Sequence, residues 1–404
     1  MTEVIEKTEY KKGYKKTKLG WIPADWEVVL AGDISSVVTG GTPSKVKPEY
    51  WNNGNINWMN SSEVNKKYIY EVENKITKIG LDNSNTKILP INTIMIALNG
   101  QGKTRGIVAI LKIESCCNQS LAGFICKEGT NYQFLFFFLQ NMYDDLRNIT
   151  GDGSRTGLNL NILRKLKIIL PPLKEQEKIA EILSAWDDGI ETLEKLIEQK
   201  EILKKATMQK LFFEKESWQM MRFDKIFKDF CKKNCPRERL LSATQENGVI
   251  PRDMLSGKVM SPDGSLDGYK LIEAGDFVIS LRSFQGGLEY SKYRGILSPA
   301  YTVLKNIIDI DKDFYRYFFK SYKFIEKYLS ISVIGIRDGK QISYSDLSSV
   351  KIPYPPLEEQ EKIGKILNCY DEELQLLNSK LEKLKEQKKG LMQKLLTGQI
   401  RIKI

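Results

Sequence analysis

The sequence contains one motif twice, and this duplication constrains the fold more than any other feature of the 404-residue chain. Each copy is a short apolar run, a Pro-Pro pair and the pattern Leu-x-Glu-Gln-Glu-Lys-Ile, at 167–179 and again at 351–363. The gapless shift that carries the first copy onto the second also carries Met-Gln-Lys-Leu at 208–211 onto the same four residues at 392–395. Agreement at one fixed offset indicates an internal duplication.

Each copy predicts a short strand followed by a long helix. Proline has no backbone N–H, so a Pro-Pro pair cannot continue strand pairing. Beyond the prolines, Leu and Ile recur at three- and four-residue spacing for about forty residues, which is typical of an amphipathic helix about 60 Å long. One helix alone cannot bury such a stripe, and duplicated units are expected to be related by a pseudo-two-fold axis. We therefore expect the two helices to pack antiparallel on one another.

A tryptophan opening is also repeated ahead of each helix. Trp26 and Ile34 have the same spacing as Trp218 and Ile226. We expect Trp26, Leu30 and Ile34 to be the first core residues of the first globular region. The duplicated unit is therefore a globular domain followed by a helix.

Each region between a tryptophan opening and the next Pro-Pro pair predicts a mixed α/β domain. A β-hairpin is expected at 89–111, and an aromatic-rich helix at 132–146 in the first region and at 314–329 in the second. The fold class is therefore mixed α/β, with two α/β domains separated by two long antiparallel helices. The expected segments are domain 1 with a polar leader at 1–165, a helix at 166–217, domain 2 at 218–349 and a second helix at 350–404.

The composition excludes several classes of protein. No apolar run approaches the roughly 18 to 20 residues that span a bilayer, so we expect a cytoplasmic protein without membrane contact. The six cysteines fit free thiols in a reducing compartment. The chain has no histidine, which excludes Ser-His and Cys-His catalysis and disfavours a zinc site at Cys116-Cys117 or at Cys231 and Cys235. The lysine-rich leader at 1–19 is expected to be mobile or to lie against a neighbouring element.

The net charge of +11 indicates a polyanionic partner. The positive excess lies equally on the two globular regions, whereas the first helical segment is slightly negative. Ordinary solubility would also explain this charge, but its distribution favours two separate surfaces for DNA or RNA. A coiled-coil scaffold without DNA specificity stays an alternative.

Two partial motifs raise enzymatic alternatives. The segment 97–104, which ends in Gly102-Lys103-Thr104, satisfies a relaxed phosphate-loop pattern, so a nuclease or NTPase using this loop is the alternative function. A phosphate loop needs a helix after it, however, and the residues after Thr104 are β-branched. The Pro-Pro pairs resemble part of an amino-methyltransferase loop, but Leu170 and Tyr354 occupy the position that requires a polar residue.

The duplicated Pro-Pro-Leu-x-Glu-Gln element, the tryptophan openings and the Gly-Thr-Pro-Ser loop at 41–44 together resemble the specificity (S) subunits of type I restriction-modification systems. The resemblance covers nearly the whole chain. It implies a non-catalytic subunit with two target-recognition domains, each reading one half of a bipartite double-stranded DNA target. Two conserved helices would set the spacing and bind two methyltransferase subunits.

The resemblance also implies the cofactors and further partners. This chain would carry no cofactor, and no metal is expected. S-adenosylmethionine would belong to the partner methyltransferase, while ATP and Mg would belong to two motor-nuclease subunits in systems that also cleave DNA.

Polar and cationic side chains on turn-rich loops are the candidates for DNA contact, because base edges are read by Arg, Lys, Asn, Gln, Ser and Thr. For each of them a solvated loop residue is the alternative interpretation. The candidates in domain 1 are Thr42, Ser44, Lys45, Gln101, Lys103, Arg105, Arg155 and Asn159. Those in domain 2 are Arg282, Ser283, Gln285, Arg337, Lys340 and Gln341. The candidates for partner contact on the helices are Gln176, Ile179, Trp186, Gln360, Ile363 and Tyr370.

Overall fold

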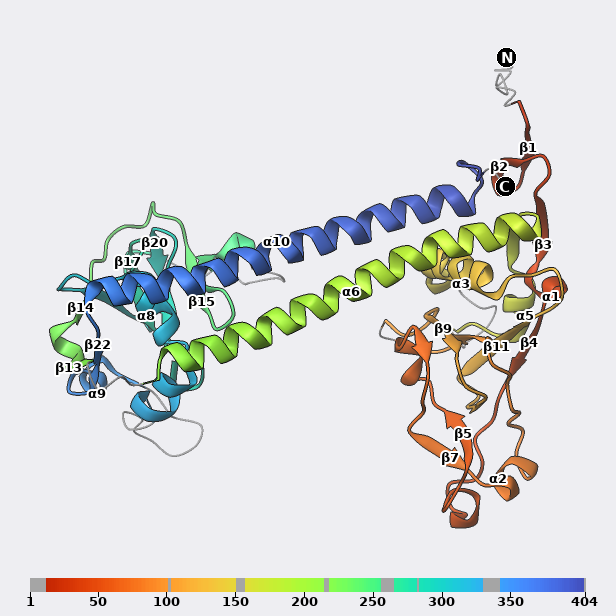
Figure 1. The fold of residues 1–404 in the computed structure, drawn as a ribbon, viewed down its shortest axis with the longest axis horizontal. Helices are drawn as coiled ribbons and strands as arrows, with labels where there is room; N and C mark the ends of the chain where they lie inside the picture. Colours follow the sequence, from red (N-terminus) through yellow and green to blue (C-terminus); the bar gives the residue numbers. More distant parts are fainter. Residues whose placement is uncertain are drawn as a thin grey trace. The chain divides into compact units, whose positions relative to one another are not determined.

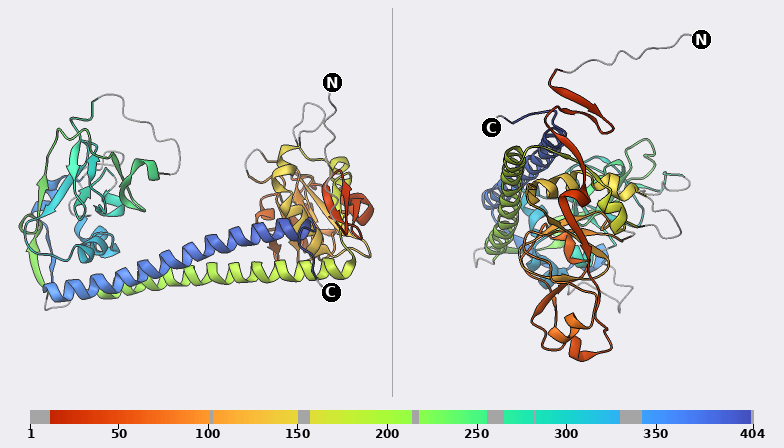
Figure 2. Two further views of the ribbon diagram at one scale, coloured as in Figure 1. Left: turned by 90° about the horizontal axis from the view of Figure 1, so that it is seen from above. Right: turned by 90° about the vertical axis from the view of Figure 1, so that its right-hand side faces the viewer.

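The chain divides into two compact units, and each contains one globular domain and a part of both long helices. Unit 1 comprises residues 1–192 and 381–404, and unit 2 comprises residues 193–380. The structure is a computed structural model that describes residues 12–100, 103–149, 157–213, 218–255, 265–281, 283–329 and 342–402. Figure 1 and Figure 2 show the ribbon in three views.

The domain of unit 1 contains a mixed five-stranded sheet in the order β4-β11-β8-β9-β6 and a three-stranded sheet in the order β10-β5-β7. Its strands are β1 Tyr14–Thr17, β2 Gly20–Pro23, β3 Glu27–Leu30, β4 Ser35–Thr39, β5 Ile56–Met59, β6 Tyr68–Ile69, β7 Asn74–Ile76, β8 Ile94–Ala97, β9 Val108–Leu111, β10 Cys116–Cys117, β11 Leu121–Cys126 and β12 Lys167–Leu170. Its short helices are α1 Ala31–Ile34, η1 Pro48–Tyr50, η2 Glu63–Asn65, α2 Lys78–Asp82, α3 Tyr132–Asn141, α4 Tyr143–Asn148 and α5 Leu160–Arg164.

The domain of unit 2 has a smaller central sheet in the order β14-β21-β18-β19. Its strands are β13 Gln219–Arg222, β14 Phe227–Phe230, β15 Leu241–Thr244, β16 Gly248–Pro251, β17 Lys270–Ile272, β18 Phe277–Ile279, β19 Glu289–Tyr290, β20 Gly295–Leu297, β21 Thr302–Asn306 and β22 Lys351–Tyr354. Its short helices are η3 Phe223–Lys225, η4 Arg252–Met254, α7 Ser283–Gly286, α8 Lys312–Phe318, η5 Phe324–Leu329 and α9 Tyr344–Ser348. The mixed α/β class predicted for both domains is confirmed.

The two long helices are α6 Leu173–Leu211 and α10 Leu357–Leu396. Each begins directly after a Pro-Pro pair, as predicted, and each follows the strand that the apolar run predicted. These strands pair antiparallel with the strand after the corresponding tryptophan, β12 with β3 and β22 with β13. The start of each domain is thereby joined to its end.

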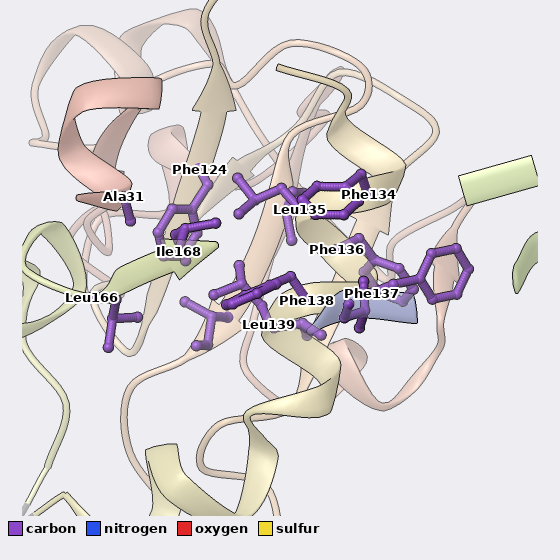
Figure 3. Packing of buried hydrophobic residues seen from close by; sticks show 14 of the residues in the cluster. Ala31, Phe124, Phe134, Leu135, Phe136, Phe137, Phe138, Leu139, Leu166 and Ile168 are labelled. Carbon is purple, nitrogen blue, oxygen red and sulfur yellow. The ribbon is translucent and has the colours of Figure 1, made fainter. Parts of the chain in front are cut away.

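The expected hairpin at 89–111 is confirmed, because β8 pairs antiparallel with β9. The aromatic helix expected at 132–146 is instead two helices, α3 and α4, with a break at Met142. The break turns Leu146 of α4 into the core. Six consecutive side chains of α3, Phe134–Leu139, are buried, and Figure 3 shows them together with Phe124 and Ile168.

The second aromatic helix, expected at 314–329, also ends early. The α-helix α8 stops at Phe318, and a π-helical turn, η5, starts at Phe324. Ser321 lies between them, donates its hydroxyl to the Phe318 carbonyl at 2.6 Å and accepts the Phe324 N–H at 3.1 Å. A serine side chain that bonds the backbone in this way competes with helical hydrogen bonds and ends the helix.

The structure describes the polar leader from residue 12 onward. Residues 14–23 form the antiparallel hairpin β1–β2, and the Tyr14 hydroxyl donates to the Gly398 carbonyl at 2.9 Å. The leader therefore lies against a neighbouring element over these residues. Residues 1–11 lie outside the described part. Trp26 and Ile34 are buried as predicted, but the prediction for Leu30 is wrong, because it is 39% exposed on the β3 strand.

The repeated Glu-Gln pair fixes each long helix to its own domain. In unit 1 the Trp26 indole N–H donates to Glu175 Oε2 at 2.9 Å, and Gln176 Oε1 accepts the Asn131 N–H at 2.9 Å. The Gln176 amide also donates to the Pro171 carbonyl at 2.8 Å. Asn131 is the N-cap of α3, so the glutamine ties the start of α6 to the aromatic helix.

Unit 2 repeats these contacts with the second copy. The Trp218 indole N–H donates to Glu359 Oε2 at 3.0 Å, and Gln360 Oε1 accepts the Asp311 N–H at 3.0 Å. Asp311 is the N-cap of α8, and the Gln360 amide donates to the Pro355 carbonyl at 2.8 Å. We refer to each set of contacts as a Glu-Gln clamp. The two clamps explain why the tryptophan and the Glu-Gln pair are both duplicated.

An arginine completes the clamp of unit 1. Arg401 donates to both oxygens of Glu175, from Nε at 2.8 Å and from Nη2 at 2.9 Å, and forms a second two-bond pair with Asp25. The side chain of Glu175 is fully buried. The hydrogen bonds that Arg401 donates to Glu175 and Asp25 raise the pKa of Arg401 above its ordinary value, so the guanidinium stays charged.

The antiparallel helix pairing is confirmed within each unit by an equivalent ion pair. In unit 1, Lys388 of α10 donates to Asp187 of α6 at 2.6 Å. In unit 2, Lys204 of α6 bonds Asp371 of α10. The shift that relates the two motif copies carries Asp187 onto Asp371 and Lys204 onto Lys388. The same aspartate–lysine pair therefore joins the helices twice, with the roles of the helices exchanged.

Each aspartate of these pairs also binds a cation from its own domain. Lys67 pairs with Asp187 in unit 1, and Arg316 pairs with Asp371 at 2.7 Å in unit 2. The Tyr317 hydroxyl donates to Asp371 as well, at 2.5 Å. The helix pair and the domain are thus held together by one carboxylate in each unit.

Replacing Glu175 by alanine is expected to destabilise unit 1 and leave unit 2 unchanged. The substitution leaves the buried Trp26 N–H without its acceptor and removes a carboxylate from Arg401, and breaking a buried ion pair costs about 3–5 kcal/mol. Hydrogen exchange should therefore accelerate in β3 and β12. Glu359→Ala is the matched control and should accelerate exchange in β13 and β22 alone. Faster exchange in both units after either single substitution would contradict one clamp per unit.

Unit 2 is expected to lose stability in acid through Asp371. Burial alone would raise the pKa of Asp371, but the hydrogen bonds from Lys204 and Tyr317 outweigh it and hold this pKa below its ordinary value. A lowered folded-state pKa stabilises the fold above the unfolded value of about 3.9, and this stabilisation disappears as the pH falls through the folded pKa.

The measurement for Asp371 is urea unfolding followed in unit 2 between pH 7 and pH 2.5. In Asp371→Asn the loss of stability over this range should be smaller than in the unmodified protein. Equal acid sensitivity of the two proteins would show that Asp371 carries no such linkage.

Candidate nucleic-acid interface

The Gly-Thr-Pro-Ser loop of unit 1 is held by two indole groups. Trp58 Nε1 donates to the Gly41 carbonyl at 2.9 Å, and Trp51 Nε1 donates to the Ser44 carbonyl at 3.1 Å. The two rings meet edge to face with centroids 5.1 Å apart. Trp58 is buried, so this aromatic segment is core on one side and supports the loop on the other.

Gly40 brings the loop against β10. A Cβ atom at this position would lie 1.8 Å from the Cys117 carbonyl oxygen, which leaves room for glycine alone. The Gly41 N–H donates to the same carbonyl at 3.0 Å. The loop and the residues after β10 are thereby brought close together.

These elements surround a polar depression of about 770 Å³. Thr42 and Lys45, two of the predicted residues, line it, and Thr42 donates its hydroxyl to Gln119 Oε1 at 2.7 Å. Ser44 is exposed on the same loop. Sequence reasoning missed most of the lining, although the density of Asn and Gln at strand ends was a usable signal. The missed polar residues are Asn52, Asn60, Asn74, Asn118 and Gln119.

The remaining candidates of domain 1 lie away from this depression or have contacts within the protein. Lys103 is exposed, and its carbonyl accepts the Tyr143 hydroxyl at 2.6 Å. The Arg105 guanidinium donates to the Arg147 carbonyl. Asn159 is the N-cap of α5, where its side chain accepts the Ile162 N–H at 2.9 Å.

In domain 2 only two of the candidates lie in the described residues, and they differ in exposure. Ser283 is fully buried, and its hydroxyl oxygen accepts the Ser280 N–H at 2.8 Å, so its role is to hold the turn after β18. Gln285 of α7 is exposed. The candidates Gln101, Arg155, Arg282, Arg337, Lys340 and Gln341 lie outside the described residues.

A two-stranded ribbon in unit 2 was missed by sequence reasoning. Strands β15 and β16 pair antiparallel, and their turn exposes Gln245, Glu246 and Asn247 beside a depression of about 490 Å³. The dipeptide Asn247-Gly248 between apolar runs is the usual signal for such a hairpin. A two-stranded ribbon fits the DNA major groove, and the side chains at this turn are types that read base edges.

Four of the six helix residues predicted to contact partners are buried within their own unit. Gln176 and Gln360 belong to the clamps, and Ile179 and Ile363 pack in the domain cores. Their position shows a structural role in joining helix and domain. Trp186 is half-buried, and so is Tyr370, whose hydroxyl lies 3.3 Å from Thr207 Oγ1.

Exposed apolar side chains on the helices are concentrated in unit 2. Leu196 and Leu203 of α6 are seven residues apart, which is about two turns, so they share a helix face. Ile202 is 60% exposed and Leu376 of α10 is 72% exposed. Contiguous exposed apolar surface marks protein contacts, whereas single exposed apolar side chains are common on any protein.

The described residues give no support to phosphate-loop or metal chemistry. The chain from Thr104 continues through a turn into the strand β9, whereas a phosphate loop leads into a helix. Within the described ranges no group of three or more metal-binding side chains comes together. All six cysteines are free thiols, as predicted, and burial raises the pKa of Cys117 to about 12. Across the same residues, no helix is both long and apolar enough to cross a bilayer.

Comparison with known proteins identifies the family. Residues 23–202 and 215–386 each match the type I restriction modification DNA specificity domain. The type I restriction enzyme MjaIX specificity subunit of Methanocaldococcus jannaschii is 26% identical and covers 98% of both chains. The MjaVIII specificity subunit of the same organism is 29% identical over 95% of this chain and 94% of its own.

Two solved structures share the fold. A chain from a study of complex assembly and conformational transition of the type I R-M system has a TM-score of 0.61 and 16% identity, with 94% of this chain and 99% of that chain covered. The S subunit of the type I restriction-modification system from M. genitalium has a TM-score of 0.54 and 19% identity, with 92% and 96% covered. The chain therefore belongs to the type I restriction-modification DNA specificity family and carries two copies of its domain.

Proposed function

We propose that this chain is the DNA-specificity subunit of a type I restriction-modification complex and reads a bipartite double-stranded target. The observation that carries the proposal is that each copy of the specificity domain presents its own polar element. In unit 1 this is the depression with Thr42 and Lys45, and in unit 2 it is the exposed turn of β15 and β16. Each element would read one half of the target.

The long helices would fix the spacing between the two half-sites. Each is held to its domain by a Glu-Gln clamp, and the two helices are joined in each unit by an aspartate–lysine pair. A domain fixed to its helix in this way cannot reorient freely. The spacer in the DNA target would then depend on the helices.

The chemistry of the complex would belong to partner subunits. The chain has no histidine, and within its described residues no group of three or more metal-binding side chains comes together. Two methyltransferase subunits would supply S-adenosylmethionine-dependent methylation, and motor-nuclease subunits, where present, would use ATP and Mg. The expected location of such a complex is the cytoplasm, where the host DNA is.

The exposed apolar side chains of unit 2 are our candidates for methyltransferase docking. Leu196, Ile202, Leu203 and Leu376 are not covered by their own domain. The first helical segment carries slight negative charge, so it is less suited to contact DNA than the globular domains are. A helix surface of this kind fits a protein partner.

The purified chain is expected to transfer no methyl group and to cleave no DNA. Adding the methyltransferase subunit should produce methylation at one bipartite motif, and both halves of that motif should change when the gene is replaced by that of another specificity subunit. The measurement is methyl transfer from labelled S-adenosylmethionine, followed by sequencing of the modified bases. Methyl transfer by the chain alone would contradict the proposal.

Charged substitutions at Ile202 and Leu376 are expected to weaken methyltransferase binding. Ile202→Glu and Leu376→Glu each place a carboxylate in an apolar contact. Disrupting a central contact of an interface costs about 2 kcal/mol or more. This cost corresponds to a loss of about thirtyfold in affinity. Gln375→Glu adds the same charge at an exposed neighbour and should bind normally. Equal affinity of all three variants in a titration with the methyltransferase would place the docking surface elsewhere.

A further inference from the structure

Two asparagine amides in the depression of unit 1 have a fixed orientation. Asn118 Oδ1 accepts the Ser120 N–H at 3.1 Å, and Asn60 Oδ1 accepts the Ser62 N–H at 2.8 Å. A backbone N–H can only donate, so the amide oxygen faces it in both residues. The NH₂ groups of Asn118 and Asn60 are then turned away from these bonds, and within the described part of the chain they donate to no other group.

Two further side chains add donors to the same depression. Gln119 has its Oε1 oxygen engaged by the Thr42 hydroxyl at 2.7 Å, which leaves its NH₂ group as a donor. Lys45 is exposed, can only donate, and has no ion-pair partner among the described residues. Four lining residues therefore offer N–H groups, while their own oxygens, where they have them, are held by the protein.

A donor-rich surface distinguishes between base edges. Guanine presents two acceptors in the major groove, N7 and O6, whereas cytosine presents the N4 amino donor, and adenine presents one donor beside one acceptor. An asparagine pairs with adenine through both its oxygen and its NH₂ group. Asn60 cannot do so, because its oxygen already accepts both the N–H and the hydroxyl of Ser62. The Asn118 oxygen is turned toward the Ser120 N–H, away from its outward NH₂ group.

We propose that the half-site read by unit 1 contains a guanine, whose N7 and O6 accept hydrogen bonds from the NH₂ groups of this depression. Asn118 and Asn60 determine the preference, and Lys45 adds a cationic donor at the same place. The inference rests on the proposed function, because it assumes that this depression meets DNA. Asn52 and Asn74 line the same depression and would face a neighbouring base pair.

Aspartate substitutions test the orientation without removing the local hydrogen bonds. In Asn118→Asp and Asn60→Asp one carboxylate oxygen still accepts the N–H of Ser120 or Ser62, but the outward NH₂ donor becomes an acceptor. The variants should therefore lose discrimination for guanine at one position of one half-site by about 5- to 150-fold, the equivalent of about 1–3 kcal/mol. Asn161→Asp on α5, an exposed residue outside the lining, controls for the added charge.

The experiment uses the full chain with its methyltransferase subunit in a host that lacks adenine methylation. The methylated motif is sequenced for the unmodified chain and for each variant, and probes with guanine, adenine or cytosine at the affected position are titrated. The inference is supported if either aspartate variant loses discrimination for guanine at one position of one half-site and the control variant does not. Thermal unfolding of each complex shows whether the variants are folded. Two positions are substituted, so that if one variant misfolds the other still tests the inference.

Two results would overturn the inference while leaving the proposed function in place. One is a bipartite motif whose discrimination for guanine is unchanged in both folded aspartate variants. The other is a motif whose unit 1 half-site consists of A·T pairs alone. Substitutions at Gln245 and Asn247 of unit 2 identify that half-site, because they should leave it unchanged. Absence of any motif in the unmodified complex would instead overturn the proposed function.

Discussion

The buried carboxylate of Glu175 and the amide of Gln176 connect a helix to a domain, and the rest of unit 1 depends on this connection. The carboxylate accepts the Trp26 indole N–H at the start of the domain. The Gln176 amide oxygen accepts the backbone N–H of Asn131, the N-cap of α3. A domain joined to its helix at two separate places cannot pivot on it. Because unit 2 repeats both contacts, the same geometry serves each domain.

Much of the fold follows from local patterns in the sequence. The Pro-Pro pairs predicted where α6 and α10 begin, since proline cannot pair as a strand but can start a helix. The apolar stripes predicted that the helices pair. Neither pattern revealed that Glu175 binds Trp26, because that contact joins residues 149 positions apart. Duplication of both residues was the available signal, and their partnership became visible only in the structure.

The candidate site was harder to predict because its parts come from separate strands. Thr42 and Lys45 were found from a turn-rich loop, but Asn60, Asn74 and Asn118 meet them only through the pairing of β5 with β7 and β10. Ser283 looked like a loop residue and is instead buried beneath its turn. The break at Ser321 in the aromatic helix depends on a hydrogen bond between a side chain and the backbone, and hydrophobic periodicity does not predict such a bond.

Under the proposed function, the contact between Gly40 and Cys117 would link DNA selectivity to packing in the interior of the domain. Gly40 positions the loop that carries Thr42, while β10, which ends at Cys117, leads directly into Asn118 and Gln119. The spacing between these two sets of side chains is therefore determined by one backbone approach in the interior. Sequence preference in such a domain can evolve through core residues that touch no nucleotide, and comparing loop residues alone would then underestimate how far two related proteins differ in the DNA they recognise.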